Sequence, residues 1–162
     1  MMQCATFYIN KVLYGIPILT VREISRFFAI TPIQGADERI EGLLNLRGQI
    51  VTVLNLGRCL GTAPVPLSEK SRIIILKTEE ALSADAINSG ISTSADPLAL
   101  LVTRIGDVVD ADDNNIEAPP PHLSGAYVSG VVQHGRELLT LLCTEWLCSL
   151  EDDKTMLPAS NI

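Results

Sequence analysis

Residues 41–56 read EGLLNLRGQIVTVLNL, and this stretch predicts a turn followed by an apolar strand. Arg47 and Gly48 stand at the turn, where Gly48 supplies a position at which a positive φ angle costs little. The β-branched residues of segment 50–53 then favour an extended, half-buried conformation. We therefore expect the chain to be organised around this turn and strand.

The same pattern returns 88 residues later, in residues 129–144, which read SGVVQHGRELLTLLCT. Gly42 aligns with Gly130 without a gap. A weaker correspondence at an offset of 84 aligns Val21 with Ile105 and Ile24 with Val108. Two copies indicate a duplication rather than a solenoid. We expect them to form equivalent turn–strand units in two separate barrels.

The rest of the chain predicts short strands and a few helical turns. Alternation and β-branching favour strands over residues 3–9, 12–18, 27–30, 72–77 and 98–102. Helical signals favour a single turn at 37–41 and helices at 56–60 and 145–150. Residues 19–24 fit a helical turn by spacing and a strand by β-branching, so both remain open. Short strands with single-turn helices indicate an all-β fold of two small barrels.

Composition excludes several classes of protein. The 162 residues carry a net charge of −7, which argues against a nucleic-acid groove. No apolar run of transmembrane length and no signal peptide is present, so we expect a cytoplasmic protein without direct membrane insertion. The four cysteines lack CxxC spacing and are expected to be buried free thiols. Neither a nucleophile motif nor a cluster of metal ligands is apparent, which predicts no enzyme activity and no metal.

Several of these segments resemble the CheW-like domain family. The matching segments are Glu41–Gly48 (EGLLNLRG) and the strand that follows it. Residues 14–16 and 21–24 resemble the family's first subdomain, and residues 101–108 and 127–131 resemble its second. The resemblance covers residues 5–150 and follows the order of the family's elements. The family often has an acidic residue where this chain has Asn55, Thr103 and Cys143.

The resemblance implies two intertwined five-stranded β-barrels with short helices. It implies subdomains at about 10–78 and 98–145, with the termini crossing between them. Residues 79–97 are small and polar and are expected to form a mobile loop, and 151–162 a tail. The implied function is a non-catalytic adaptor that couples methyl-accepting chemoreceptors to a CheA-like histidine kinase. Its partners would be the receptor's helical tip and the kinase regulatory domain, with no cofactor, and the partners would recruit it to receptor arrays.

Arg47 is the first candidate for the interface with the receptor or the kinase. The equivalent position of the second copy is Gly135, so closing the turn does not require an arginine. The planar guanidinium suits carboxylates and carbonyls at an interface. The resemblance implies the same role for Val21 and Glu23, near a receptor-binding groove, and we include the neighbouring Leu46 and Asn45. A core role for Val21 and a solvated surface charge for Glu23 carry about equal weight.

Two other functions remain open at this point. An orphan adaptor of the same family could serve a kinase pathway outside chemotaxis, such as pilus motility or second-messenger control. A small ligand-binding barrel or hydrolase would need a pocket with convergent polar groups, and the sequence offers few candidates for one.

Overall fold

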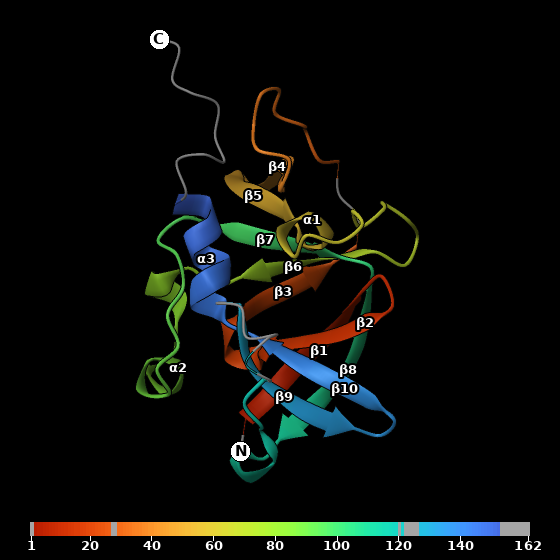
Figure 1. Cartoon of the computed structure of the whole chain (residues 1–162). Helices are drawn as coiled ribbons and strands as arrows, with labels where there is room; N and C mark the ends of the chain where they lie inside the picture. The colour runs from red at the N-terminus through yellow and green to blue at the C-terminus, as the bar shows by residue number, and fades with distance from the viewer. Residues whose placement is uncertain (1, 27–28, 120, 122–126, 153–162) are drawn as a thin grey trace.

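The computed structural model of the chain describes residues 2–26, 29–119, 121 and 127–152 (Figure 1). No helix in these segments is long and apolar enough to cross a membrane.

The strands in the described residues form two five-stranded mixed sheets, one above the other in Figure 1. The first sheet has the order β8 (Arg104–Ala111), β1 (Met2–Ile9), β2 (Val12–Pro17), β10 (Glu137–Leu142), β9 (Val128–His134). The second has the order β3 (Val21–Ser25), β6 (Arg72–Leu76), β7 (Leu98–Val102), β5 (Gln49–Asn55), β4 (Ile40–Leu46). The expected all-β fold with two five-stranded units is confirmed at this level.

Each sheet takes strands from both halves of the sequence. The hairpin β1–β2 pairs with strands from the end of the chain, while β6 and β7 join β3, β4 and β5. Read in order, the two sheets have the same pattern of neighbours, with one parallel pair, β2–β10 or β7–β5. The two halves are therefore intertwined by exchange of a hairpin.

The register of pairing repeats the offset of 88 residues found in the sequence. Leu44 lies opposite Val51 in the hairpin β4–β5, and Val132 lies opposite Leu139 in the hairpin β9–β10. Both hairpins also contain a register shift at the equivalent place, near Gly42 in the first. Of the predicted equivalent turn–strand units in two separate barrels, the structure confirms the equivalence and the placement in two separate sheets.

In each sheet, one isolated β-bridge links an edge strand to the chain that follows the strand at the opposite edge. Beyond β3, Thr31 and Leu43 of β4 exchange two backbone hydrogen bonds of 2.8 Å. Beyond β8, Glu117 and Val131 of β9 do the same, at 2.9 and 2.8 Å. No ladder joins the two edge strands of either sheet in the described residues. The barrel prediction is therefore supported only as far as two five-stranded sheets with these bridges.

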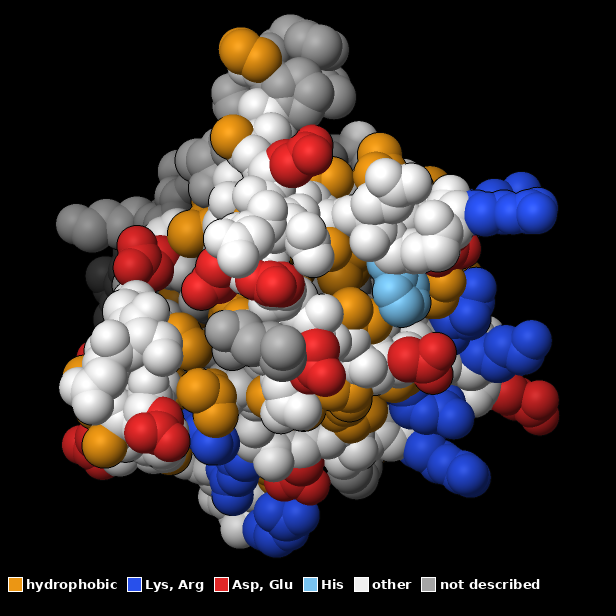
Figure 2. Space-filling view, turned by 90° about the horizontal axis from the view of Figure 1, so that it is seen from below, with side chains coloured by type: hydrophobic (Ala, Val, Ile, Leu, Met, Phe, Trp, Pro, Cys, Tyr) orange, Lys and Arg blue, Asp and Glu red, His pale blue; other side chains and the backbone are white. Residues whose placement is uncertain are grey.

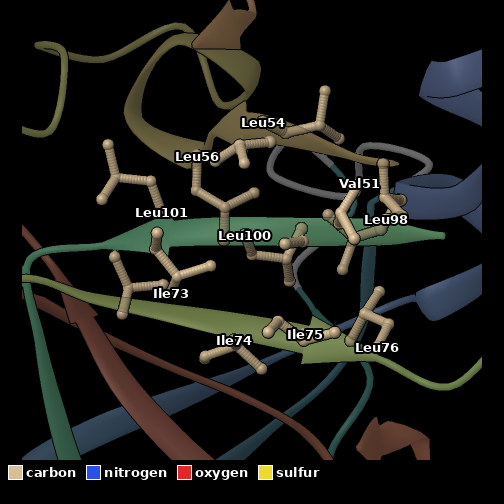
Figure 3. Close-up of a cluster of buried hydrophobic side chains, with 14 of the residues drawn as sticks. Val51, Leu54, Leu56, Ile73, Ile74, Ile75, Leu76, Leu98, Leu100 and Leu101 are labelled. Carbon is tan, nitrogen blue, oxygen red and sulfur yellow. The ribbon is translucent and has the colours of Figure 1, made fainter. Parts of the chain in front are cut away.

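Buried aliphatic side chains fill the space around the second sheet (Figure 3). All five residues of β7 are buried, as expected for a strand between β6 and β5. The short helix α1 (Leu56–Cys59) adds Leu56 to the same cluster. The largest fully buried side chains of this region are Leu44, Leu54, Leu56, Ile73, Ile74, Ile75, Leu98, Leu100 and Leu101. This packing holds the sheet edges that carry the site described below.

Gly42 is required by the close approach of the chain that follows β3. A Cβ atom at position 42 would lie 2.3 Å from the carbonyl oxygen of Thr31, within the bridge described above. The residue also has a φ angle of +154°, which side chains rarely adopt. Neither the approach nor the angle tolerates a side chain.

The structure corrects two of the expected elements. Residues 37–41 form no helix, because the Asp37 carboxylate accepts hydrogen bonds from the backbone and side chain of Arg39 and β4 begins at Ile40. In the expected strand 27–30, Ala29 and Ile30 belong to no strand, and residues 27 and 28 lie outside the described residues. The ambiguous segment 19–24 contains both alternatives, since a 3₁₀ turn at Ile18–Thr20 precedes β3.

Short helices occupy the remaining connections. The segment expected to be a mobile loop contains a 3₁₀ turn (Glu79–Ala81) and α2 (Ala84–Asn88), which the Ser83 hydroxyl caps. A further 3₁₀ turn lies at Asp113–Asn115, and α3 (Thr144–Asp152) closes the described chain. Helices this short leave no sustained period in the sequence. Of the expected tail at 151–162, residues 153–162 lie outside the described residues.

The surroundings of Asn55 explain why this chain has an amide where the family often has an acidic residue. Its side chain is buried, and its amide nitrogen donates to the Glu41 carboxylate at 3.2 Å and to the Val65 carbonyl at 3.1 Å. Its oxygen accepts from the Val65 backbone N–H at 2.9 Å. A carboxylate here could not donate and would face Glu41, so the amide fits this site.

Candidate functional site

Two of the predicted site residues meet in a bidentate ion pair. Arg47 lies at the turn between β4 and β5, with a φ angle of 51°. Its two terminal nitrogens each lie 3.0 Å from one carboxylate oxygen of Glu23 on β3. Strands β3 and β4 are opposite edges of one sheet, so the contact shows that the sheet curls. Arg22 supports this corner by donating to the Gln49 side chain at 3.2 Å.

Solvent reaches this ion pair. The Arg47 side chain is 65% exposed and that of Glu23 is 26% exposed. Hydrogen bonding to Glu23 raises the pKa of Arg47, so the arginine stays charged. Surface ion pairs contribute only about 0–1 kcal/mol to folding. The pair therefore orients two charged groups at the surface and adds little to stability.

The neighbouring residues of the turn shape it from two sides. The Asn45 carboxamide oxygen accepts a hydrogen bond from the backbone N–H of Gly48 at 2.8 Å. Leu46 is only 5% exposed and packs in the main core cluster. Leu46 therefore anchors the turn from below and offers little surface to a partner.

Val21 and Glu23 line an apolar groove of about 260 Å³ between the two sheets. Val21 and Ile24 come from β3, and Ile105 and Val108 come from β8, the edge strand of the other sheet. Ile24 is 43% exposed and Val108 is 57% exposed, although both are large apolar side chains. The groove therefore offers aliphatic surface with the Glu23 carboxylate, held by Arg47, on its wall.

The duplication explains why these residues face each other. Val21 and Ile105 are partners at the offset of 84, and so are Ile24 and Val108. Each lies on the edge strand of its sheet, beside a register shift of the same kind. Sequence reasoning missed Ile24, Ile105 and Val108 as site residues, although this offset was the signal that pointed to them.

The site has no arrangement suited to catalysis in the described residues. No three His, Cys, Asp or Glu side chains there lie close enough to hold a metal ion. None of the four cysteines forms a disulfide in the described residues, and Cys4 and Cys148 are buried while Cys59 and Cys143 are partly so. Burial raises the pKa of Cys59 to about 12, so its thiol stays protonated and a poor nucleophile.

The aliphatic side chains of the groove, with charged groups at its rim, suit the apolar side of an amphipathic helix.

Comparison with known proteins agrees with this geometry. The family model of the CheW-like domain matches residues 3–151. The chemotaxis protein CheW of Treponema pallidum is 27% identical over 147 residues, covering 86% of this chain and 78% of the relative. The Bacillus subtilis protein of the same name is 21% identical over 155 residues, covering 94% and 90%.

A solved structure shares both the sequence pattern and the fold. The crystal structure of the scaffolding protein TtCheW from Thermoanaerobacter tengcongensis superposes with a TM-score of 0.72 at 29% sequence identity. The match covers 87% of this chain and 88% of that one.

Proposed function

The chain belongs to the CheW-like domain family, and we propose that it is a non-catalytic scaffold that couples chemoreceptors to a CheA-like histidine kinase in chemotaxis signalling. The named relatives are chemotaxis and scaffolding proteins. The observation that carries the proposal at the level of residues is the apolar groove between the sheets, with Glu23, the ion-pair partner of Arg47, on its wall.

The groove is proposed to receive the helical tip of a receptor. Val21 and Ile24 on one side, and Ile105 and Val108 on the other, provide the aliphatic contacts. Arg47 and Glu23 provide a polar rim that fixes the position of the bound helix. The kinase regulatory domain is the second partner. Holding both partners at once raises their effective concentration and fixes their mutual orientation.

We take residues 5–150 as one domain whose sheets close into barrels through the bridges at Thr31 and Glu117, with approximate subdomains at 10–78 and 98–145. The segment 79–97 is proposed as a mobile surface arm. The scaffold would act in the cytoplasm, where its partners recruit it to receptor arrays.

A charge placed in the groove should disrupt receptor binding. Val21→Asp and Val108→Asp each replace an aliphatic contact by a carboxylate that the bound helix would desolvate. We expect each variant to lose about 2 kcal/mol or more of binding free energy, which corresponds to roughly thirtyfold weaker binding. The measurement is the dissociation constant for a cytoplasmic fragment of a host chemoreceptor, taken with a thermal melt of each variant.

Val12→Asp is the matched control for this experiment. Val12 is 49% exposed on β2 and does not line the groove. The Val12→Asp variant should bind the receptor fragment with the same affinity as the unmodified chain. Equal affinity of folded Val21→Asp, Val108→Asp and the unmodified chain would rule out the groove as the receptor site.

A further inference from the structure

The apolar groove continues at both ends into further hollows. Ile18 is shared with a hollow of about 530 Å³, whose lining includes Gln3 and Asp113. Ile105 is shared with a hollow of about 340 Å³ on the other side, lined by basic residues. A fourth hollow, of about 420 Å³, adjoins the basic one through Arg72. Each hollow shares a lining residue with the next, and we call the four together the furrow, whose middle part lies between the two sheets.

One end of the furrow is strongly basic. Its two hollows contain four basic side chains and a single carboxylate, that of Glu69. Arg104 lies with its guanidinium carbon 3.6 Å from the centre of the Tyr8 ring, and the Tyr8 hydroxyl donates to Glu137 at 2.7 Å. Within the described residues, none of the four basic side chains forms an ion pair. The four are Arg26, Lys70, Arg72 and Arg104.

This basic end is unusual in a chain with a net charge of −7. Figure 2 shows that the charges are unevenly placed on the face seen from below, with Lys and Arg gathered along two margins and Asp and Glu spread across the centre. An acidic segment approaching this protein is repelled overall. Local attraction therefore depends on where the segment meets the surface.

The duplication relates the basic end to the opposite end of the furrow, and the charges there differ. At the offset of 84, Arg104 corresponds to Thr20 and Arg26 to Asp110. Ile24 pairs with Ile74 on β6, and its repeat partner Val108 pairs with Ala5 on β1. Ile74 and Ala5 are therefore equivalent positions in the two sheets. Continuing these registers, Arg72 corresponds to Gln3. Three arginines at one end thus stand where the other has threonine, aspartate and glutamine.

We propose that the charge difference between its ends makes the furrow bind a helical partner in one direction, with acidic side chains of the partner over Arg26, Lys70, Arg72 and Arg104. This inference rests on the proposed function, because the occupant is the helical tip of a receptor. The aliphatic middle is nearly two-fold symmetric and accepts a helix in either direction. Besides the Arg47–Glu23 pair, which has no arginine counterpart at Gly135, the charged ends distinguish the two directions. They do so by attraction at the basic end and by repulsion from Asp110 and Asp113 at the other.

Charge reversal at the basic end tests the proposal. Arg26→Glu with Lys70→Glu changes two exposed side chains for which the structure shows no hydrogen bond or ion pair. Rim charges act mainly on association rate and its salt dependence. We expect about tenfold slower association with the host receptor fragment at low salt, a smaller difference at high salt, and a nearly unchanged dissociation rate.

The matched control reverses two basic residues outside the furrow, Lys77→Glu with Arg136→Glu. It produces the same net charge and should associate much faster than the furrow variant. If both double variants slow association equally, only net charge matters and the proposal is wrong. If the unmodified chain binds and the furrow variant binds at the same rate, the proposed function stands and this inference fails. If the unmodified chain does not bind, both fail.

Direction is read by disulfide cross-linking in the complex. Ser68→Cys places a thiol at the basic end, and Gln3→Cys on β1 places one at the opposite end. The receptor fragment carries one cysteine at the more acidic flank of its tip. The Ser68→Cys chain should cross-link to it several times more than the Gln3→Cys chain, with the unmodified chain giving the background from native thiols. Equal yields, or the reverse order, would contradict a single direction.

Discussion

Gly42→Ala is expected to lower the free energy of unfolding by about 4 kcal/mol. The added Cβ would lie 2.3 Å from the Thr31 carbonyl oxygen, so the segment after β3 must move away from β4. That movement breaks the two 2.8 Å hydrogen bonds between Thr31 and Leu43. Overpacking costs about 1–3 kcal/mol and each lost hydrogen bond about 1 kcal/mol. For a domain of this size the melting temperature should fall by roughly 10 °C.

Gly61→Ala separates this steric effect from the cost of a positive φ angle. Gly61 has a φ angle of +74°, but nothing lies within 4 Å of its added Cβ. Its loss should be limited to about 1–2 kcal/mol. Urea unfolding of both variants gives the comparison. Equal losses would mean that the bridge at Thr31 adds nothing to the fold.

Arg47→Ala and Arg47→Gly should weaken binding to the receptor fragment or the kinase regulatory domain by about thirtyfold, the effect of losing an interface anchor worth about 2 kcal/mol. Either change removes the fork that holds Glu23 at 3.0 Å. Stability should change by less than about 0.5 kcal/mol for alanine. Glycine should be somewhat more stable, since Arg47 has a φ angle of 51° and Gly135 occupies the equivalent position at 61°.

Arg47→Lys distinguishes the role of the fork from that of the charge. Lysine keeps the positive charge but cannot offer two parallel donors to the Glu23 carboxylate. If the fork positions Glu23, lysine should bind nearly as weakly as alanine. Unchanged binding of all three folded variants to both partners would remove Arg47 from the interface, and a large loss of stability would make its role structural.

Elements held by contacts between residues close in sequence could be predicted, and those held by contacts between distant residues could not. The hairpin around Leu44 and Val51 could be predicted, because a glycine turn and alternating aliphatic residues act over a few positions. The repeat extended the same prediction to Val132 and Leu139. Around Asp37 the local signal was ambiguous, because its carboxylate accepts a hydrogen bond from the Arg39 backbone and forms a turn in place of the expected helical turn.

The site itself could be predicted only in part. Arg47 and Glu23 were both selected, but their contact depends on the curl of the whole sheet, which no local pattern specifies. The exchange of β1–β2 and β6–β7 between sheets brings β8 against β3, and that exchange is a property of the assembled fold. For this reason Ile105 and Val108 were recognised as a repeat and not as the opposite wall of the groove.

The central claim is that one copy of this chain holds a receptor and a kinase together. The direct test mixes vesicles bearing the cytoplasmic fragment of a host chemoreceptor with the kinase regulatory domain, with and without the chain, and measures the kinase domain that sediments with the vesicles. We expect sedimentation of the kinase domain to require the chain, and to fall when Val21→Asp replaces the unmodified chain. The same amount of sedimented kinase domain with and without the chain would contradict the account.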